Sequence, residues 1–229
     1  MGRKDFSARI LVSITGNKDS DWQSKLAEIK KYKITKVALF VECFTKVHRE
    51  KIYAALLKSN IKQIPLVHIR HDTTKDELKF LTENFGSKYF TIHEEGFNHL
   101  TDWKGYYKNL FLEMNTDNFV SKKVKVEKIG GFCIDLSHFK VDEKNQSEEF
   151  KSIAKKMKNR ALFACNHLNG YSYSKNTDVH TINNLNEFDY LTTLPKVLFG
   201  KVIGIETYNS IAEQLKFKKY VVKLLENKN

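Results

Sequence analysis

Six hydrophobic runs in this sequence end on a side chain that can bind a metal ion. Strands favour β-branched and aromatic residues and are depleted in Asp, so a run that stops on His, Asp or Glu is unusual. Six such ends predict strands whose carboxyl ends converge on one polar centre. The terminal residues are His68, His93, Glu113, Asp135, His167 and Glu206.

Three further candidates follow the predicted strand ends. His138 comes three residues after Asp135, in the loop expected there. Asp178 and His180 are separated by one residue, so an extended segment points both side chains the same way. Together these residues make nine candidate ligands, five His and four carboxylates. Imidazole and carboxylate without thiolate suit Zn, Mn or Fe better than a structural Cys-type zinc site, and nine ligands predict two or three ions.

Each residue also has a structural explanation. A lone His at a strand end is more often a hydrogen-bonded core or rim residue than a ligand. Asp135 alone could cap the following helix, and Asp178 could be a turn residue. The joint pattern favours metal binding over these separate explanations. Other polar residues near strand ends are expected to belong to the rim, namely Glu42, His71, Glu94, Glu95 and His99.

Strand-like and helix-like segments alternate along the whole sequence. Residues 115–128 have no clear helical pattern, and we expect a loop or a degraded helix there. Helices are expected at 19–33, 46–59, 74–84, 103–108, 147–158 and 210–225. Strands are expected at 10–15, 36–42, 64–68, 88–93, 109–113, 131–135, 161–167 and 202–206.

Eight strands with intervening helices imply a parallel sheet. Closing it gives an α/β fold, a small (β/α)8 TIM barrel formed by residues 1–229 as a single domain. An open doubly wound sheet is the alternative, but Gly16 stands alone and no Gly-x-Gly-x-x-Gly follows the first strand. Residues two positions before the ligands share their face and are small or apolar, as a barrel interior requires. They are Leu66, Thr91, Phe111, Cys133, Cys165 and Gly204.

Composition adds broader expectations. The net charge is +12 with a pI of about 9.4, but lysines are dispersed, so charge only mildly favours a polyanionic partner. Mean hydropathy is −0.48, and no apolar run approaches the roughly 18 residues of a membrane span. The N-terminus does not resemble a secretory signal. Three cysteines, Cys43, Cys133 and Cys165, predict reduced thiols in a cytoplasmic protein.

At the candidate ligands the sequence resembles the xylose-isomerase-like TIM barrels, and within them the endonuclease IV family. His68 and His93 fall where that family has its strand-three and strand-four histidines. The likeness follows the chain in order and covers its whole length. The matching motifs are Leu112-Glu113, Asp135-Leu136-Ser137-His138, His167-Leu168-Asn169, Asp178-Val179-His180 and Ile205-Glu206-Thr207.

The resemblance implies three zinc ions that bind a scissile phosphate and activate a water molecule for cleavage of duplex DNA at abasic sites. One ion would be held by His68, His93 and Glu113. A second would be held by Glu113, Asp135, His167 and Glu206, with Glu113 bridging the two. His138, Asp178 and His180 would hold the third.

The sequence also departs from the family pattern. Ile69-Arg70-His71 replaces a Tyr after the strand-three His, and Glu94-Glu95 replaces a Pro-Gly. The chain is shorter than typical members, which implies trimmed DNA-gripping loops.

The alternative is a sugar or sugar-phosphate isomerase or epimerase with a small sugar substrate. Its single Mn-type ion would be held by Glu113, Asp135, His167 and Glu206, and the two glutamates would shuttle the proton as catalytic residues. A second alternative is a barrel that binds metal without turnover. The group His138, Asp178 and His180 distinguishes the nuclease from the isomerase, because only the nuclease needs an ion there.

Overall fold

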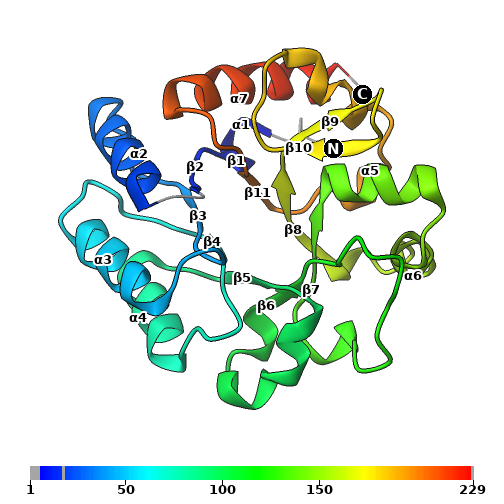
Figure 1. Ribbon diagram of the computed structural model, residues 1–229, viewed down its shortest axis with the longest axis horizontal. Helices are drawn as coiled ribbons and strands as arrows, with labels where there is room; N and C mark the ends of the chain where they lie inside the picture. Colours follow the sequence, from blue (N-terminus) through cyan, green and yellow to red (C-terminus); the bar gives the residue numbers. More distant parts are fainter. Residues whose placement is uncertain (1–5, 17–18, 228–229) are drawn as a thin grey trace.

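The computed structural model describes residues 6–16 and 19–227. Nine parallel strands form one sheet in the order β1-β11-β8-β7-β6-β5-β4-β3-β2. Because only Val12 separates β1 from β2, the sheet returns to its own first strand and forms a nearly closed barrel (Figure 1). The predicted TIM barrel is therefore confirmed. The strands are β1 Ile10–Leu11, β2 Ser13–Ile14, β3 Ala38–Phe40, β4 Leu66–His68, β5 Tyr89–Ile92, β6 Leu110–Leu112, β7 Gly131–Asp135, β8 Phe163–Leu168 and β11 Val202–Ile205.

The strand predicted over residues 10–15 is split because it changes neighbours at Val12. β1 pairs with β11, whereas β2 pairs with β3. The backbone N–H of Ser13 donates to Oε1 of Gln214 at 2.7 Å instead of to a strand. A side-chain amide thus satisfies the backbone where the ladder is interrupted.

Helices surround the barrel and cover the outer face of the strands (Figure 1). Their ends carry the expected signals: Thr74 and Glu77 form a capping box, and Gly86 ends the same helix with φ at 65°. The helices are α1 Phe6–Arg9, α2 Asp19–Lys31, α3 Lys46–Leu57, α4 Lys75–Phe85, α5 Leu136–Asn145, α6 Glu148–Lys156 and α7 Ile211–Glu226.

The barrel interior has the composition that the sequence predicts. Thr91 is buried, and Gly204 lies where a Cβ atom would come within 2.9 Å of Ala38 and 3.0 Å of Leu66, so only glycine fits without a shift. The residues two positions before the candidate ligands therefore face the barrel interior, as the alternation of side chains along each strand predicts. One buried cluster comprises Leu11, Ala38, Phe40, Leu66, Phe111, Cys133, Cys165 and Val202.

The helix predicted over residues 103–108 is wrong. Two short 3₁₀ turns replace it, η2 Leu100–Trp103 and η3 Tyr107–Asn109, after a further turn η1 Glu94–Asn98. Gly105 between them has φ at 99°, a value outside the helical region. Trp103 is buried and its Nε1 donates to the carbonyl of Thr73 at 2.7 Å, so tertiary packing directs the chain here.

The segment after β7 also differs from the prediction. α5 begins directly at Leu136, so His138 lies in the first turn of a helix and not in a loop. After β8 the chain forms an antiparallel hairpin, β9 Gly170–Ser172 with β10 Thr177–Val179, and then a 3₁₀ segment, η6 Leu185–Thr192. Three shorter 3₁₀ turns complete the described elements, namely η4 Val126–Lys128, η5 Arg160–Leu162 and η7 Lys196–Leu198.

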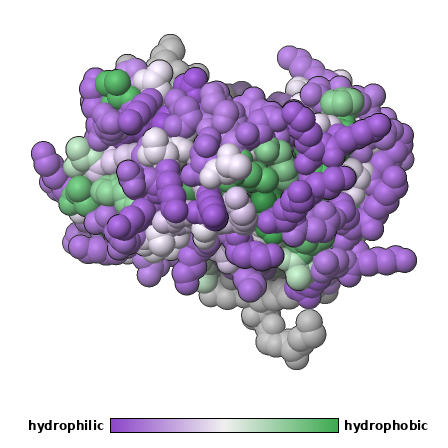
Figure 2. All heavy atoms as spheres, turned by 90° about the horizontal axis from the view of Figure 1, so that it is seen from below, coloured by the Kyte–Doolittle hydropathy of each residue, from purple (hydrophilic) through white to green (hydrophobic). Residues whose placement is uncertain are grey.

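The molecular surface is mostly hydrophilic on the face shown in Figure 2, with small separate apolar patches. Among residues 6–16 and 19–227, no helix has the length and apolar character needed to cross a membrane. All three cysteines are free thiols, and Cys133 and Cys165 are buried.

Candidate metal centre

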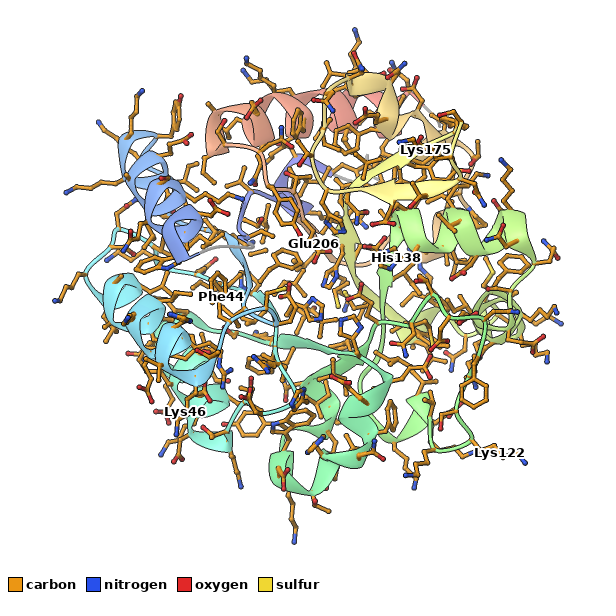
Figure 3. The ribbon with its side chains drawn as sticks, viewed as in Figure 1. Phe44, Lys46, Lys122, His138, Lys175 and Glu206 are labelled. Atoms are coloured by element: carbon orange, nitrogen blue, oxygen red, sulfur yellow. The ribbon has the colours of Figure 1, made fainter. Side chains whose placement is uncertain are left out.

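All nine predicted ligands meet at one mouth of the barrel. Within each of the groups below, the candidate ligand atoms lie within 4.8 Å of one another. In Figure 3, His138 and Glu206 lie near the barrel axis, where side chains from different strands converge. The groups are His68, His93 and Glu113; Glu113, Asp135, His167 and Glu206; His138, Asp178 and His180; and, in addition, His68, His167 and Glu206.

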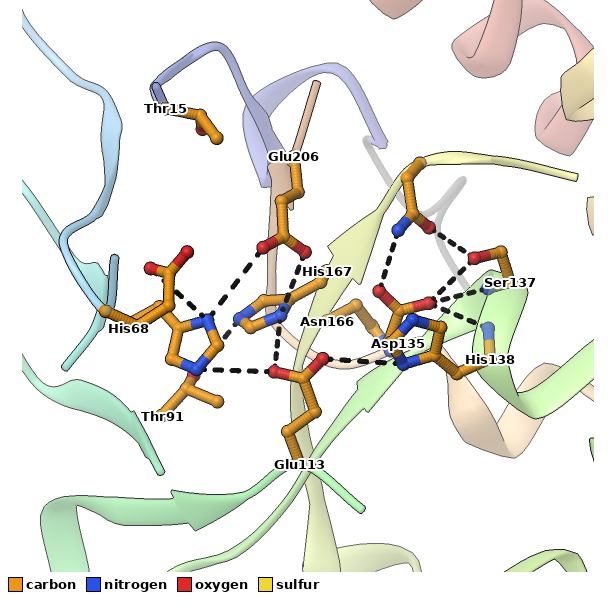
Figure 4. Close-up of polar contacts among 12 residues, drawn as sticks. Thr15, His68, Thr91, Glu113, Asp135, Ser137, His138, Asn166, His167 and Glu206 are labelled. Carbon is orange, nitrogen blue, oxygen red and sulfur yellow. Dashed lines mark hydrogen bonds and ion pairs between the residues drawn. The ribbon is translucent and has the colours of Figure 1, made fainter. Parts of the chain in front are cut away.

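Glu113 lies at the centre of the arrangement, directly after β6. Its Oε2 is 2.9 Å from Nδ1 of His167 and 3.6 Å from Nε2 of His68 (Figure 4). Glu206, directly after β11, places Oε2 3.3 Å from the same Nδ1 of His167. The ring of His93 lies 4.8 Å from that of His68, centroid to centroid. The ends of five strands, β4, β5, β6, β8 and β11, thus contribute one compact set of nitrogen and oxygen atoms.

The third group adjoins this set through His138. Nδ1 of His138 is 3.6 Å from Oε1 of Glu113, and its Nε2 is 3.8 Å from Oδ2 of Asp178. Nε2 of His180 lies 3.1 Å from the same Oδ2 of Asp178. Asp178 belongs to β10, so the hairpin brings this pair over the barrel mouth. The three groups are therefore contiguous, and Glu113 belongs to two of them and touches the third.

Asp135 uses its two oxygens differently. Oδ1 accepts hydrogen bonds from the backbone N–H groups of Ser137 and His138, both at 2.9 Å, which caps α5. Oδ2 accepts a hydrogen bond from Nδ2 of Asn169 at 3.0 Å. Helix capping and membership of a metal group are thus compatible in one carboxylate.

Other buried side chains fix the orientation of the candidate ligands. Nε2 of His167 lies 3.2 Å from Oγ1 of Thr91, and Nδ1 of His180 lies 3.1 Å from the carbonyl of Glu206. Asn169 is fully buried between Asp135 and the hydroxyl of Ser137. Outer partners of this kind set the tautomer and ring orientation of metal-binding histidines. Sequence reasoning missed these roles, because they depend on contacts between distant strands.

Several atoms of the centre are buried without a hydrogen bond of acceptable geometry among the described residues. Buried polar atoms are normally hydrogen-bonded, so a cluster of exceptions needs an explanation. Divalent cations would satisfy nitrogen and carboxylate atoms of this kind, and the residues present therefore fit such ions. The atoms are both ring nitrogens of His68, Oε2 of Glu42, Oε2 of Glu113, Nδ1 of His138 and Nδ1 of His167.

The protonation of the centre follows from its mixture of acids and imidazoles. Burial alone would raise the pKa of Glu113, but His167 and His68 outweigh it and hold that pKa well below its usual value. Burial likewise opposes a charged ring at His138, yet Asp135, Asp178 and Glu113 raise its pKa to about 10. Without metal, histidinium–carboxylate pairs therefore hold the centre together, and metal binding must displace protons.

Burial also acts on the neighbouring groups. It raises the pKa of Asp135, in spite of the nearby ring of His138. Burial also opposes a charged ring at His180, but Asp178 and Glu206 raise the pKa of that ring to about 9. Burial lowers the pKa of His93, which leaves that ring neutral and ready to bind an ion.

One residue assigned to the rim from the sequence belongs to the centre. Oε2 of Glu42 lies 3.6 Å from Nδ1 of His68. The available signal was the same one that predicted the other candidate ligands, because Glu42 ends a predicted strand and Phe40, two residues earlier, is in the barrel interior.

The other residues assigned to the rim stay outside the candidate groups. Nδ1 of His71 lies 3.1 Å from Oε1 of Glu95, and the His71 ring stacks on that of His99. Glu94 accepts a hydrogen bond from the backbone of Ser121.

A cavity of about 430 Å³ opens beside the centre. His93 and Glu42 form its wall toward the candidate metal groups. Cavities of this size accommodate small ligands or one residue of a larger one. The complete lining is Glu42, Cys43, Ile69, Arg70, His71, Ile92, His93, Glu95, Gly96 and Trp103.

Comparison with known proteins shows a likeness in fold to a solved structure. No protein-family model matches the sequence, and no curated protein does. Among solved structures, a D-tagatose 3-epimerase-like protein superposes with a TM-score of 0.52 over 96% of this chain and 98% of the other. The two sequences are 12% identical, so the likeness concerns the fold alone. The chain therefore shares its TIM-barrel architecture with an epimerase-like protein.

Proposed function

We propose that this protein is a metal-dependent phosphodiesterase that uses three divalent ions, with zinc as the expected metal, and cleaves DNA at abasic sites. The observation that carries the proposal is the third ligand group, His138, Asp178 and His180, adjoining the other two through Glu113. One ion would need only three or four ligands. Three contiguous groups are the arrangement that the resemblance to endonuclease IV implies.

The chemistry would divide among the residues of the centre. When bound, divalent ions supply Lewis acidity and lower the pKa of a water molecule that attacks phosphorus. Glu113 connects two ligand groups, so it would keep them at a fixed separation. Thr91 holds the ring of His167, and Asn169 holds Asp135, which preserves the ligand positions during turnover.

Side chains on the segments that follow the strand ends are of the types that would bind an anionic, ring-containing substrate. Lys46, Lys122 and Lys175 lie on segments that follow the carboxyl ends of β3, β6 and β8, and Figure 3 shows them toward the outer edge of the molecule, on different sides of Glu206 and His138. Positive charges at these places would attract phosphates and offset the carboxylates of the centre. Two exposed aromatic side chains, Phe119 and Tyr173, lie on the same segments and could stack on bases.

The direct test uses a duplex with one abasic site and metal-loaded protein. The proposal predicts a nick at that site, loss of cleavage with a chelator, and a steep decline with added salt because phosphate contacts release counterions. His180→Ala should reduce cleavage strongly, whereas His99→Ala, which removes a rim imidazole outside the ligand groups, should not. Intact duplex under every Zn or Mn loading would reject the proposal.

A second candidate is a sugar or sugar-phosphate epimerase. The group Glu113, Asp135, His167 and Glu206 is complete for one ion without the third group, and the cavity beside it suits a small polar molecule. The likeness in fold to a D-tagatose 3-epimerase-like protein supports this candidate. Exchange of a sugar C–H proton with solvent, retained in His180→Ala, would select it over the phosphodiesterase.

A further inference from the structure

Glu42 is the acidic residue closest to the candidate ligands that belongs to none of the described ligand groups. It follows β3, and the backbone N–H of Val41 donates to the carbonyl of His68 at 3.0 Å. This bond fixes the end of β3 against the end of β4. The Glu42 carboxylate is therefore placed beside the imidazole of His68 by the sheet itself.

The contacts of the two side chains are complementary. Oε2 of Glu42 is 3.6 Å from Nδ1 of His68 and has no hydrogen-bond partner among the described residues. Its other oxygen, Oε1, lies 3.5 Å from the thiol of Cys43, which donates to it. On the far side of the ring, Nε2 of His68 faces Oε2 of Glu113 at 3.6 Å. One edge of the imidazole thus faces Glu113, and the other faces Glu42 and, slightly farther away, Glu206.

We infer that Glu42 is a positioning residue whose carboxylate, 3.6 Å from Nδ1 of His68, would hold the imidazole proton on Nδ1 and so keep the lone pair of Nε2 available for a metal ion. The inference rests on the metal centre of the proposed function. A neutral imidazole carries its proton on one nitrogen, and a carboxylate acceptor decides which one. Glu206 also approaches Nδ1 of His68, at 3.9 Å, and shares a ligand group with His68 and His167, so Glu42 is the nearer of two carboxylates at this nitrogen.

The test measures metal affinity by competition with a chromophoric chelator in the full-length protein. Loss of an outer-shell acceptor typically weakens metal binding about 10- to 100-fold, and this is expected for Glu42→Ala. Glu42→Gln keeps a carbonyl acceptor and should recover most of the affinity. Glu95→Ala, which removes a carboxylate from the same cavity but not from His68, should bind metal like the wild type.

A second measurement separates positioning from a general structural effect. In a His68→Ala background, Glu42→Ala should cause no further loss, because its effect passes through the missing imidazole. The absorption spectrum of the Co(II)-substituted protein should change in Glu42→Ala and return toward wild type in Glu42→Gln. Equal metal affinity in Glu42→Ala and wild type would overturn the inference. Metal affinity in Glu42→Gln as low as in Glu42→Ala would also overturn it, because Glu42 would then be a direct ligand. Absence of metal from the wild type would instead reject the proposed function.

Discussion

Glu113 is the residue on which the candidate centre most depends. It belongs to two ligand groups, and its Oε1 lies 3.6 Å from the ring of His138 in the third. Removing one ligand from a shared cluster removes both a bond and the negative charge that balances the cations. A single substitution at Glu113 should therefore affect more than one ion.

We expect Glu113→Ala to lose at least one ion per chain and to abolish metal-dependent activity. Elemental analysis after dialysis against metal-free buffer measures the loss, and circular dichroism checks that the variant is folded. Glu113→Gln is the matched variant, since it keeps the shape but removes the charge. Undiminished metal content in Glu113→Ala would show that this carboxylate is not a ligand.

The sequence predicted the positions of individual residues well where local pattern determines them. His68, Asp135 and Glu206 end runs whose preceding residues fill the barrel, so alternation alone places them on the inner face. The partners Thr91 and Asn169 were not identified, because their hydrogen bonds join strands far apart in the chain. Periodicity reports which face a side chain occupies, but not which side chain it meets there.

At the scale of elements, the junction of β7 and α5 links folding to the site. Asp135 ends the strand, caps the helix and presents its second oxygen to Asn169 and the candidate ligand group. The helix places His138 in its first turn, within reach of Glu113. No loop separates β7 from α5. The sequence therefore lacks the turn signals that usually mark the start of a helix, and this helix was not predicted.

Two substitutions at Asp135 should separate these roles. With a chelator present, Asp135→Ala should lower the free energy of unfolding by about 1–2 kcal/mol through loss of the cap, while Asn still accepts the capping bonds and should stay close to wild type. Both variants should bind metal more weakly, because both lack the carboxylate. Denaturant unfolding in chelator measures the first effect, and chelator competition measures the second. Equal stability of the Ala and wild-type proteins would argue against the capping role.

At the scale of the whole molecule, the barrel concentrates acids and imidazoles at one mouth of a protein whose net charge is +12. Alternating strands and helices predicted this architecture. The helix expected at 103–108 was wrong because Gly105 adopts a positive φ and the buried Trp103 packs by tertiary contacts. The hairpin that carries Asp178 was not foreseen either, since short antiparallel strands have little periodicity.

The protonation of the centre predicts opposite effects of pH on the metal-free and metal-loaded protein. The pKa of His138 is raised from 6.5 to about 10, so its charge pairing stabilises the folded state fully below pH 6.5 and is lost as pH rises through about 10. Between pH 6 and 8 the metal-free protein in chelator should therefore lose stability as pH rises. Burial lowers the pKa of Lys25 to about 8, so Lys25 loses most of its charge only above this range.

Metal binding should strengthen over the same range, since protons compete with metal for the imidazoles. Thermal unfolding at pH 6, 7 and 8, with chelator or with zinc, measures both trends. The gap between the two melting temperatures should widen as pH rises. The variant His138→Ala should show a weaker dependence on pH in chelator. A gap that narrows with rising pH would contradict the assignment of these histidines.

The number of metal ions bound per chain tests the central claim most directly. Purified protein is loaded with zinc, freed of loosely bound metal and analysed by mass spectrometry of the native protein and by elemental analysis. Three ions in the wild type and two in His180→Ala, with three retained in the control His99→Ala, are the predicted results. A wild type that binds at most one ion, or a His180→Ala variant with an unchanged count, would contradict the three-ion centre.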